Sequence, residues 1–412
     1  MKILAFDRDT DKKVKITAFL TLLISFGLAG WTASFINFSS EVANINSLDL
    51  GIIWSVKEIP VLLGFILAII LSFISESRIL GVFVAISGFG IILTGFANYD
   101  MLGDTLYNNF VFSKFTFHMI VITFILSIGF NYFHTAKDNL IMHSTSSEKT
   151  AVYMGKIAGY GLVGTIAGYL IITILGFINF SDDPEIKYTI IYIIIGLPLI
   201  IGGVLGSQQA DPSKNLKENI EIFFKMKFLR YYILTFFSSS IYYLFIIYGT
   251  YQLVSKFSVS LGIIGGIFLV RSLSVYFFKI KVPDFINSKG IAFIMQLKFG
   301  GELIILLCYA FVPEKFTLIG LFVVFVILQL FESIVKTYMQ GISQPHEMRT
   351  NLVLFDRITN FSAIIIPAVT GFLWFEMGDN GSMVIFILGS AIALICLIIS
   401  FFLYPSSLFE DN

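Results

Sequence analysis

The stretch from Leu50 to Gly81 reads LGIIWSVKEIPVLLGFILAIILSFISESRILG and is apolar for long enough to cross a lipid bilayer. About 20 residues at a rise of ~1.5 Å span the ~30 Å hydrocarbon core. Yet Lys57 and Glu58 lie inside this run, where a buried charge is costly. Pro60 follows directly and removes a backbone hydrogen-bond donor from the same turn. The pattern predicts a membrane helix whose charges need a partner or a function.

The opening of this stretch recurs about half a chain later. Ser47–Ile53 reads SLDLGII, and Ser258–Ile264 reads SVSLGII. The second copy carries Arg271 within its apolar run. A membrane helix with a buried charge, present twice in one chain, is typical of a transporter built from two related halves.

Composition places the whole chain in the same class. Of its 412 residues, 57% are hydrophobic and 13% are charged, with a mean hydropathy of +0.87, whereas a soluble domain carries about 25% charged residues. We therefore expect an all-α polytopic membrane protein. The net charge of zero offers no argument for a nucleic-acid partner.

No motif of a soluble enzyme is present. The sequence has no phosphate-binding glycine loop and no nucleophile motif. Cys308 and Cys396 both fall inside apolar spans, and the four histidines are scattered, so neither a disulfide framework nor a metal-ligand spacing is indicated. We expect a protein that is not an enzyme, without cofactor or metal.

Hydropathy predicts twelve transmembrane helices in two six-helix bundles. Their approximate ranges are 16–38, 50–74, 79–98, 115–136, 151–177, 187–206, 229–251, 260–280, 290–312, 316–338, 352–374 and 382–404. The predicted domains are an N-terminal bundle over residues 1–206, a linker over 207–228 and a C-terminal bundle over 229–412. The linker has apolar residues at helical spacing among lysines, which indicates a short helix on the membrane surface.

The distribution of lysine and arginine predicts the orientation. If the N-terminus is cytoplasmic, most of the 27 basic residues fall in cytoplasmic loops, and the outer loops hold only Lys114, Lys187, Lys256 and Lys315. Because basic residues favour the cytoplasmic side, we expect both termini and the central linker to be cytoplasmic, in a cell membrane of the inner or plasma type.

The chain resembles the major facilitator superfamily over essentially its full length. The resemblance rests on two collinear halves of six helices, a basic central loop and a Gly-rich fifth helix with Gly155, Gly159, Gly164 and Gly168. The loop between helices two and three diverges: Ser72–Gly81 lacks the aspartate and the glycines of the family pattern, although Glu76 and Arg78 could preserve its charge pair. The resemblance leaves the subfamily unassigned. It implies that helices 1, 4, 7 and 10 line a central cavity and that helices 2, 5, 8 and 11 gate it.

Four buried charges are candidates for binding the substrate or a coupling ion. Glu58 is either a protonatable carboxylate or a structural one paired with a cation of another helix. Lys57 points about 100° away from Glu58 around the helix, so it is not expected to be its partner. Arg271 could clamp an anionic group or pair with Glu58. Glu332 could serve in coupling or form a same-helix pair with Lys336.

Other charged and aromatic residues have simpler interpretations. Lys298 and Glu302 have the spacing of a same-helix pair on a helix that the resemblance makes peripheral, so we expect structural neutralisation. Tyr242 and Tyr243 lie on the seventh helix, as cavity aromatics or as interfacial anchors. Charges at the cytoplasmic ends of helices could form an inner gate or be ordinary interfacial charges: Glu76, Arg78, Asp138, Asp356 and Arg357.

The sequence as a whole favours a secondary active transporter. It would move a small organic solute, anionic or amphipathic, by alternating access in the lipid bilayer, with protons as the favoured coupling ion. A monomer suffices for this mechanism. The alternative is a non-transporting sensor or scaffold on a transporter-like fold.

Overall fold

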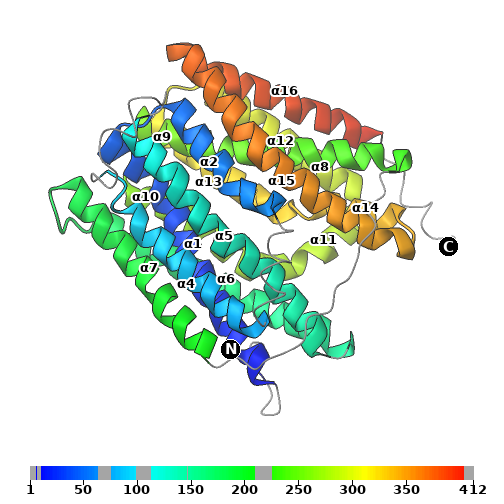
Figure 1. The fold of residues 1–412 in the computed structure, drawn as a ribbon. Coiled ribbons are helices and arrows are strands. Elements are labelled where there is room, and N and C mark those ends of the chain that lie inside the picture. The colour runs from blue at the N-terminus through cyan, green and yellow to red at the C-terminus, as the bar shows by residue number, and fades with distance from the viewer. Residues whose placement is uncertain are drawn as a thin grey trace. The chain divides into compact units, whose positions relative to one another are not determined.

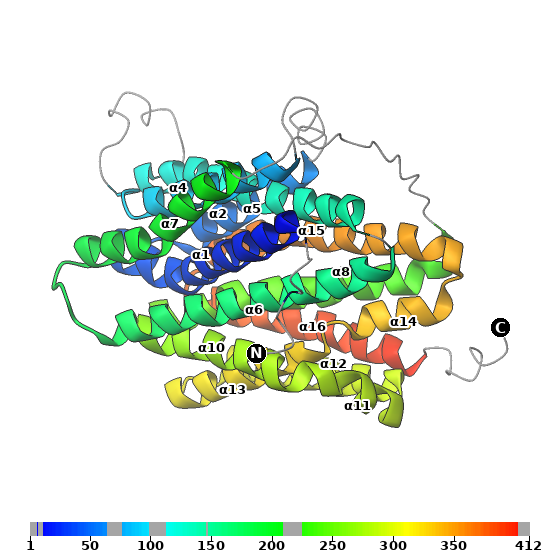
Figure 2. The same ribbon diagram turned by 90° about the horizontal axis from the view of Figure 1, so that it is seen from below.

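The structure is a computed structural model, and it describes residues 6, 11–63, 76–98, 113–145, 147–208 and 225–402. Its regular structure in these ranges is helical (Figures 1 and 2). Ten of the helices are long and apolar enough to cross a membrane, and Arg78–Thr94 is a shorter apolar helix. These lengths and compositions confirm the predicted all-α membrane architecture. The linker segment 209–224, with its predicted surface helix, lies outside the described residues.

The described helices correspond to the predicted spans, and residues 64–74 of the second predicted span lie outside the described residues. Their bounds in the first half are α1 Lys12–Ala43, α2 Ser47–Leu62, α4 Glu76–Thr94, α5 Lys114–Ser144, α6 Ser147–Phe177 and α7 Pro184–Gln208. The second half contains α8 Leu229–Leu244, α9 Thr250–Ser255, α10 Leu261–Phe278, α11 Val282–Lys289, α12 Ile291–Phe311, α13 Lys315–Leu328, α14 Ile334–Ile342, α15 Pro345–Glu376 and α16 Gly381–Phe401.

Two of the predicted spans are interrupted. The seventh span runs from α8 through a π-helical turn, η4 (Phe245–Gly249), into α9. The tenth runs from α13 through a 3₁₀ turn, η6 (Gln329–Phe331), into α14. Such irregular turns inside a helix are frequent at functional sites, and in membrane transporters they are tolerated where the backbone is buried or lines a cavity.

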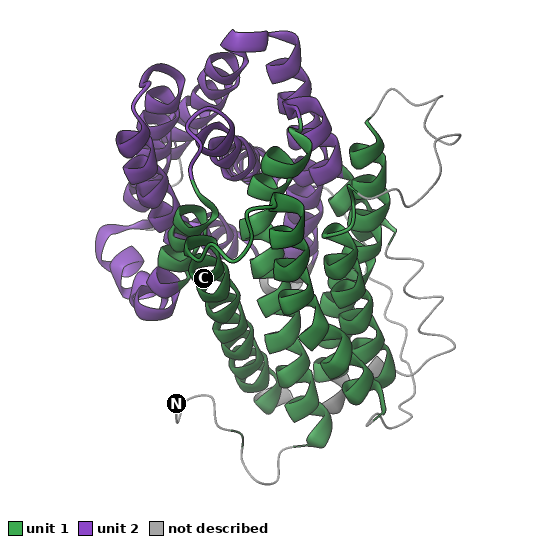
Figure 3. Cartoon of the chain, turned by 90° about the vertical axis from the view of Figure 1, so that its left-hand side faces the viewer, with its two compact units in different colours: residues 1–45, 56–217, 260–272 green, residues 46–55, 218–259, 273–412 purple. Residues whose placement is uncertain are grey.

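The chain forms two compact units (Figure 3). Unit 1 comprises residues 1–45, 56–217 and 260–272, and unit 2 comprises residues 46–55, 218–259 and 273–412. Residues 46–55 group with unit 2 and residues 260–272 with unit 1. The division into two bundles at residues 207–228 stays a prediction.

Glycines set the close packing of unit 1. The helix α6 lies along α1, and α4 lies against α7 and α5. A Cβ on Gly164 or Gly168 would collide with the backbone carbonyl of Leu22 or Phe26 on α1, so these positions let the two helices approach closely. Gly155 of the same helix has open space around it. The Gly-rich face thus has a packing role at its C-terminal end.

Unit 2 is built on α12 against α16 and on α8 against α15 and α16. The helix α15 begins with a capping box in which Gln344 and Glu347 bond to each other's backbone. Lys225 and Lys227, which precede α8, donate to the two carboxylate oxygens of Glu347 at 2.8 and 2.6 Å. This contact ties the residues before α8 to the start of α15.

Candidate functional site

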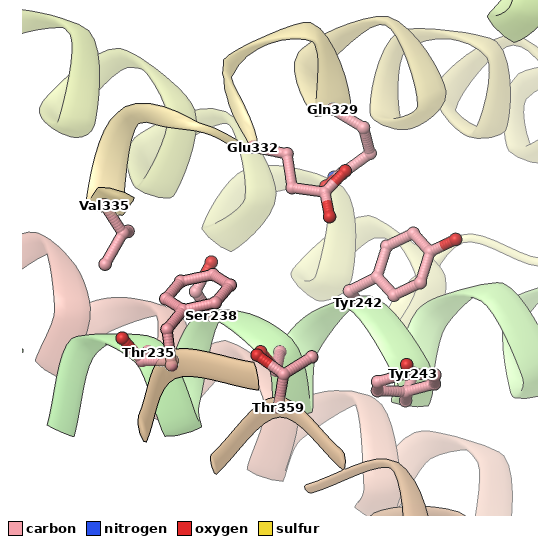
Figure 4. A pocket seen from close by; sticks show the side chains of 10 residues that line it. Thr235, Ser238, Tyr242, Tyr243, Gln329, Glu332, Val335 and Thr359 are labelled. Atoms are coloured by element: carbon pink, nitrogen blue, oxygen red, sulfur yellow. The ribbon is translucent and has the colours of Figure 1, made fainter. Parts of the chain in front are cut away.

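A small polar cavity lies within unit 2, between α8, the η6–α14 segment and α15 (Figure 4). Hydroxyl groups dominate its wall, together with one amide and one carboxylate. The lining residues are Thr235, Ser238, Ser239, Tyr242, Tyr243, Gln329, Glu332, Val335, Phe355 and Thr359. Hydroxyls and a few precisely placed polar groups in an otherwise apolar setting are what a small-molecule site requires.

The wall of the cavity follows from helical periodicity and from the break in the tenth span. Thr235, Ser238 and Tyr242 recur at spacings of three and four on α8, so their side chains share one face. Ser239 reaches α15, where its hydroxyl donates to Thr359 at 3.2 Å. On the opposite side Gln329 and Glu332 project from η6 and the turn after it (Figure 4).

A buried charge pair adjoins this cavity. Lys298 and Glu302 on α12 form an ion pair of 2.7 Å and are 1% and 0% exposed. Ser238 accepts a hydrogen bond from Lys298 at 3.2 Å, and Gln329 donates to Glu302 at 3.1 Å. The expected same-helix pair is present, and it is buried and shares Ser238 and Gln329 with the cavity wall.

Unit 1 contains a second buried pair, and here the expected geometry was wrong. The Nζ of Lys57 pairs with the Oε1 of Glu58, and both side chains are 11% exposed. The long lysine stem bends back to the neighbouring carboxylate, so the 100° separation of the two Cβ atoms does not prevent contact. Ser127 of α5 donates to the carbonyl of Lys57, and Asn131 donates to Ser127 at 2.7 Å.

The same-helix pair expected for Lys336 is also replaced. Its ammonium lies 3.4 Å from the carboxylate of Asp356 on α15 and 4.2 Å from the ring centroid of Phe355. The reason is that η6 and the turn at Glu332 break the helix, so Glu332 and Lys336 no longer follow the regular i,i+4 geometry of one helix. Glu332 is exposed and lines the cavity.

The remaining candidates lie on separate elements. Arg271 is half-buried on α10 within unit 1. Of the gate candidates, Asp138 pairs with Lys137 at 3.2 Å on α5, and Asp356 pairs with Lys336 as described. Arg78 and Arg357 are exposed, and the side chain of Glu76 lies outside the described residues. A gate network that joins these charges stays a prediction.

The repeated sequence motif has a packing role in each unit. In unit 2, a Cβ on Gly51 would collide with the carbonyl oxygen of Pro367 on α15. In unit 1, a Cβ on Gly262 would lie 2.8 Å from the ring of Phe177 on α6. The two glycines occupy matching positions in SLDLGII and SVSLGII, and each allows its helix to meet a glycine- or proline-bearing helix closely.

Several residues that line the cavity are uncharged, so a search of the sequence for buried charges does not find them. Thr235, Ser238, Ser239 and Thr359 are hydroxyl residues within apolar spans, and the signal that identifies the first three is their recurrence on one face of α8. Tyr242 and Tyr243 lie on the cavity wall. Tyr248, further along the same span, is fully buried and donates to the carbonyl of Pro367 at 2.6 Å.

No protein-family model matches the sequence, and no curated protein matches it. Solved structures do match the fold. A bacterial homologue of the iron transporter ferroportin in an inward-facing state is 14% identical, covers 96% of this chain and 99% of its own, and has a TM-score of 0.70. A variant of the nucleoside transporter NupG is 13% identical, with coverages of 95% and 100% and a TM-score of 0.69. A D-xylose–proton symporter is 10% identical, with coverages of 95% and 98% and a TM-score of 0.69.

Proposed function

We propose that this chain, which has the fold of the major facilitator superfamily, is a secondary active transporter that moves a small organic solute across the membrane by alternating access. The observation that carries the proposal is the hydroxyl-lined cavity of unit 2. It lies among membrane-spanning helices, and one of its walls is formed where the tenth span is interrupted. The solved structures of similar fold are named as transporters of unlike solutes, so they support transport but not a substrate.

The chemistry of the cavity favours an amphipathic solute with hydrogen-bonding groups. Hydroxyls, the amide of Gln329 and the carboxylate of Glu332 face it beside the aromatic rings of Tyr242 and Phe355. The case for an anionic solute rested on Lys57 and Arg271. Lys57 is paired with Glu58, so Arg271 alone now supports that class.

Protons are the proposed coupling ion, and carboxylates within the membrane are the candidate sites, Glu58 and Glu332 among them. Glu58 is buried beside an ammonium, and Glu332 lines the cavity. Replacing each with glutamine keeps the shape but removes the titration. If transport driven by a pH gradient in proteoliposomes were unchanged in both Glu58→Gln and Glu332→Gln, neither residue would be the coupling site.

The test of transport begins with a ligand. Purified protein is screened for thermal stabilisation by organic anions, nutrients and drugs, because a bound ligand stabilises by mass action. Each hit is then tested for counterflow in proteoliposomes. We expect Ser239→Leu, which fills the cavity, to weaken binding about tenfold or more, or about 1.4 kcal/mol. Ser288→Leu, at an exposed position of α11, is the control and should bind normally.

The outcome that contradicts the proposal is equally clear. A ligand that stabilises the protein but shows no counterflow would favour a non-transporting sensor on this fold. If Ser239→Leu and Ser288→Leu weakened ligand binding equally, the cavity would not be the binding site, because the effect would not depend on the position of the substitution.

A further inference from the structure

Glu302 differs from an ordinary structural carboxylate in the use of its two oxygens. Its Oε1 accepts from Lys298 at 2.7 Å and from Gln329 at 3.1 Å. Its Oε2 is buried and has no hydrogen-bond partner among the described residues. Buried polar atoms are nearly always hydrogen-bonded, and an exception calls for a reason. An unpaired oxygen of a carboxylate is where a proton can be added.

The pair is connected to the cavity through two side chains. Ser238 and Gln329 line the cavity, and each also bonds to one member of the pair. Glu302 itself lies behind them and is fully buried. A change of charge at the pair would therefore act directly on Ser238 and Gln329, the two side chains that also face the cavity.

Gln329 also connects the pair to the interruption of the tenth span. It is the first residue of η6, and its amide nitrogen lies 3.1 Å from Glu302 and 3.5 Å from the carbonyl of Phe325. If Glu302 gains a proton, it becomes a weaker acceptor for this amide. A short 3₁₀ segment within a helix often marks a hinge. We therefore expect protonation of Glu302 to change the conformation at η6.

The titratable surroundings of Glu302 are simple. Lys298 lies on its own helix, and Cys396 of α16 is within electrostatic reach of both charges. The α8 and η6 residues in contact, Ser238 and Gln329, do not titrate. Among the other elements packed against α12, α13 has a titratable side chain only at its first residue. The helix α14 carries Lys336, which is paired with α15, and the buried Tyr338. The titratable residues of α11 are Asp284 and Lys289.

We propose that Glu302 binds the coupling proton of the transporter proposed above. A proton from water in the cavity adds to Oε2, which converts the carboxylate to a neutral acid and leaves the Lys298 ammonium as a net positive charge behind the cavity wall. Release of the proton to the opposite side restores the neutral pair. The role in coupling depends on the proposed function, whereas binding of the proton does not.

The proton itself is the probe. Infrared difference spectra of the full-length protein in liposomes, taken between about pH 8 and pH 5 without solute, report the carbonyl band of a protonated carboxyl, and a pH indicator reports proton uptake. We expect Glu302→Gln to lose a buried carboxyl band and about one proton of uptake per molecule. Glu376→Gln, at the exposed C-terminal end of α15, is the control and should keep that band.

Two further variants keep the test decisive if the single change unfolds the protein. Lys298→Met with Glu302→Gln removes both charges together, which is far less disruptive than leaving one unpaired in the interior, and it should also lack the band. Lys298→Met alone should keep the band and change its dependence on pH, because the charge beside the carboxyl is gone. A purely structural pair predicts no such band to move.

A carboxyl band that survives in Glu302→Gln or in the double variant would overturn the proposal, as would a wild-type protein without any such band. The result is separable from the fate of the transport proposal. Loss of the band without counterflow by any ligand would leave a proton site in a protein that does not transport. Counterflow with an unchanged band would leave a transporter whose proton binds elsewhere.

Discussion

Glu347 shows how a single side chain can make one end of a helix depend on pH. Burial would raise the pKa of its carboxyl, but the hydrogen bonds from Lys225, Lys227 and the backbone of Gln344 outweigh this and lower the pKa to about 2. The ordinary value for a glutamate is about 4.3. The carboxylate therefore stabilises the folded state above about pH 4, and this stabilisation is lost as the pH falls toward 2.

We accordingly expect Glu347→Gln to lower the melting temperature of the purified protein at neutral pH. The difference between wild type and variant should shrink as the pH falls from about 4 toward 2, because the wild-type carboxyl then takes up its proton. Glu376→Gln, at the exposed C-terminal end of the same helix, is the control and should change the melting temperature little at either pH. A constant difference across this range would mean that the charge of Glu347 is not what stabilises the contact.

The Lys57–Glu58 pair marks a limit of residue-level reasoning from sequence. Helical geometry correctly gives the directions of the two Cβ atoms, but it does not limit where the end of a long, flexible side chain reaches. Lys336 shows the opposite case, in which regular geometry was assumed across a break that the sequence did not reveal. In both cases the depth of the charge was predictable and its partner was not.

At the scale of helices, the repeated Leu-Gly-Ile-Ile motif makes a comparison possible within one chain. Gly51 meets α15 and Gly262 meets α6, each inside its own compact unit. Adding a methyl group where backbone or ring atoms already occupy the space costs typically about 1–3 kcal/mol. Close approach, not conformational freedom, accounts for glycine at these two positions, since both lie in regular helix.

Gly51→Ala and Gly262→Ala should therefore both lower thermal stability. Gly155→Ala on α6 has open space around it, so the better helix propensity of alanine should raise stability by roughly 0.5–1 kcal/mol. Melting curves in one detergent give all three values. If Gly155→Ala lowered the stability as much as Gly51→Ala and Gly262→Ala, the loss would come from replacing any helical glycine in detergent and not from the contacts of the motif.

At the scale of the whole molecule, the orientation in the membrane is a prediction from the lysines and arginines. The segment between α10 and α12 is expected on the cytoplasmic side, and the segment between α6 and α7 on the outer side. In a background with Cys308 and Cys396 replaced, Asn179→Cys should react with an impermeant maleimide in intact cells. Ser288→Cys should react only after the membrane is opened. Both positions are exposed, so the reversed result would mean the opposite orientation.

The sequence by itself determined the class of fold. Twelve apolar stretches, each long enough to span a bilayer, leave little choice, because a backbone in lipid must satisfy its hydrogen bonds internally and forms helices. The pairing of Ser47–Ile53 with Ser258–Ile264 likewise needed only the letters of the chain. These features are local, since each depends on neighbours along the sequence, and they were predictable for that reason.

Only the tertiary structure decided which side chains meet. It placed hydroxyls of α8, the broken tenth span and a residue of α15 around one cavity, and it placed the Lys298–Glu302 pair behind that wall. Some of these contacts join residues more than a hundred positions apart in the chain. They arise from helix packing and from the break in the tenth span, which hydropathy does not register. Hydropathy measures how long a segment is apolar, whereas the direction in which each face points depends on the helices packed against it.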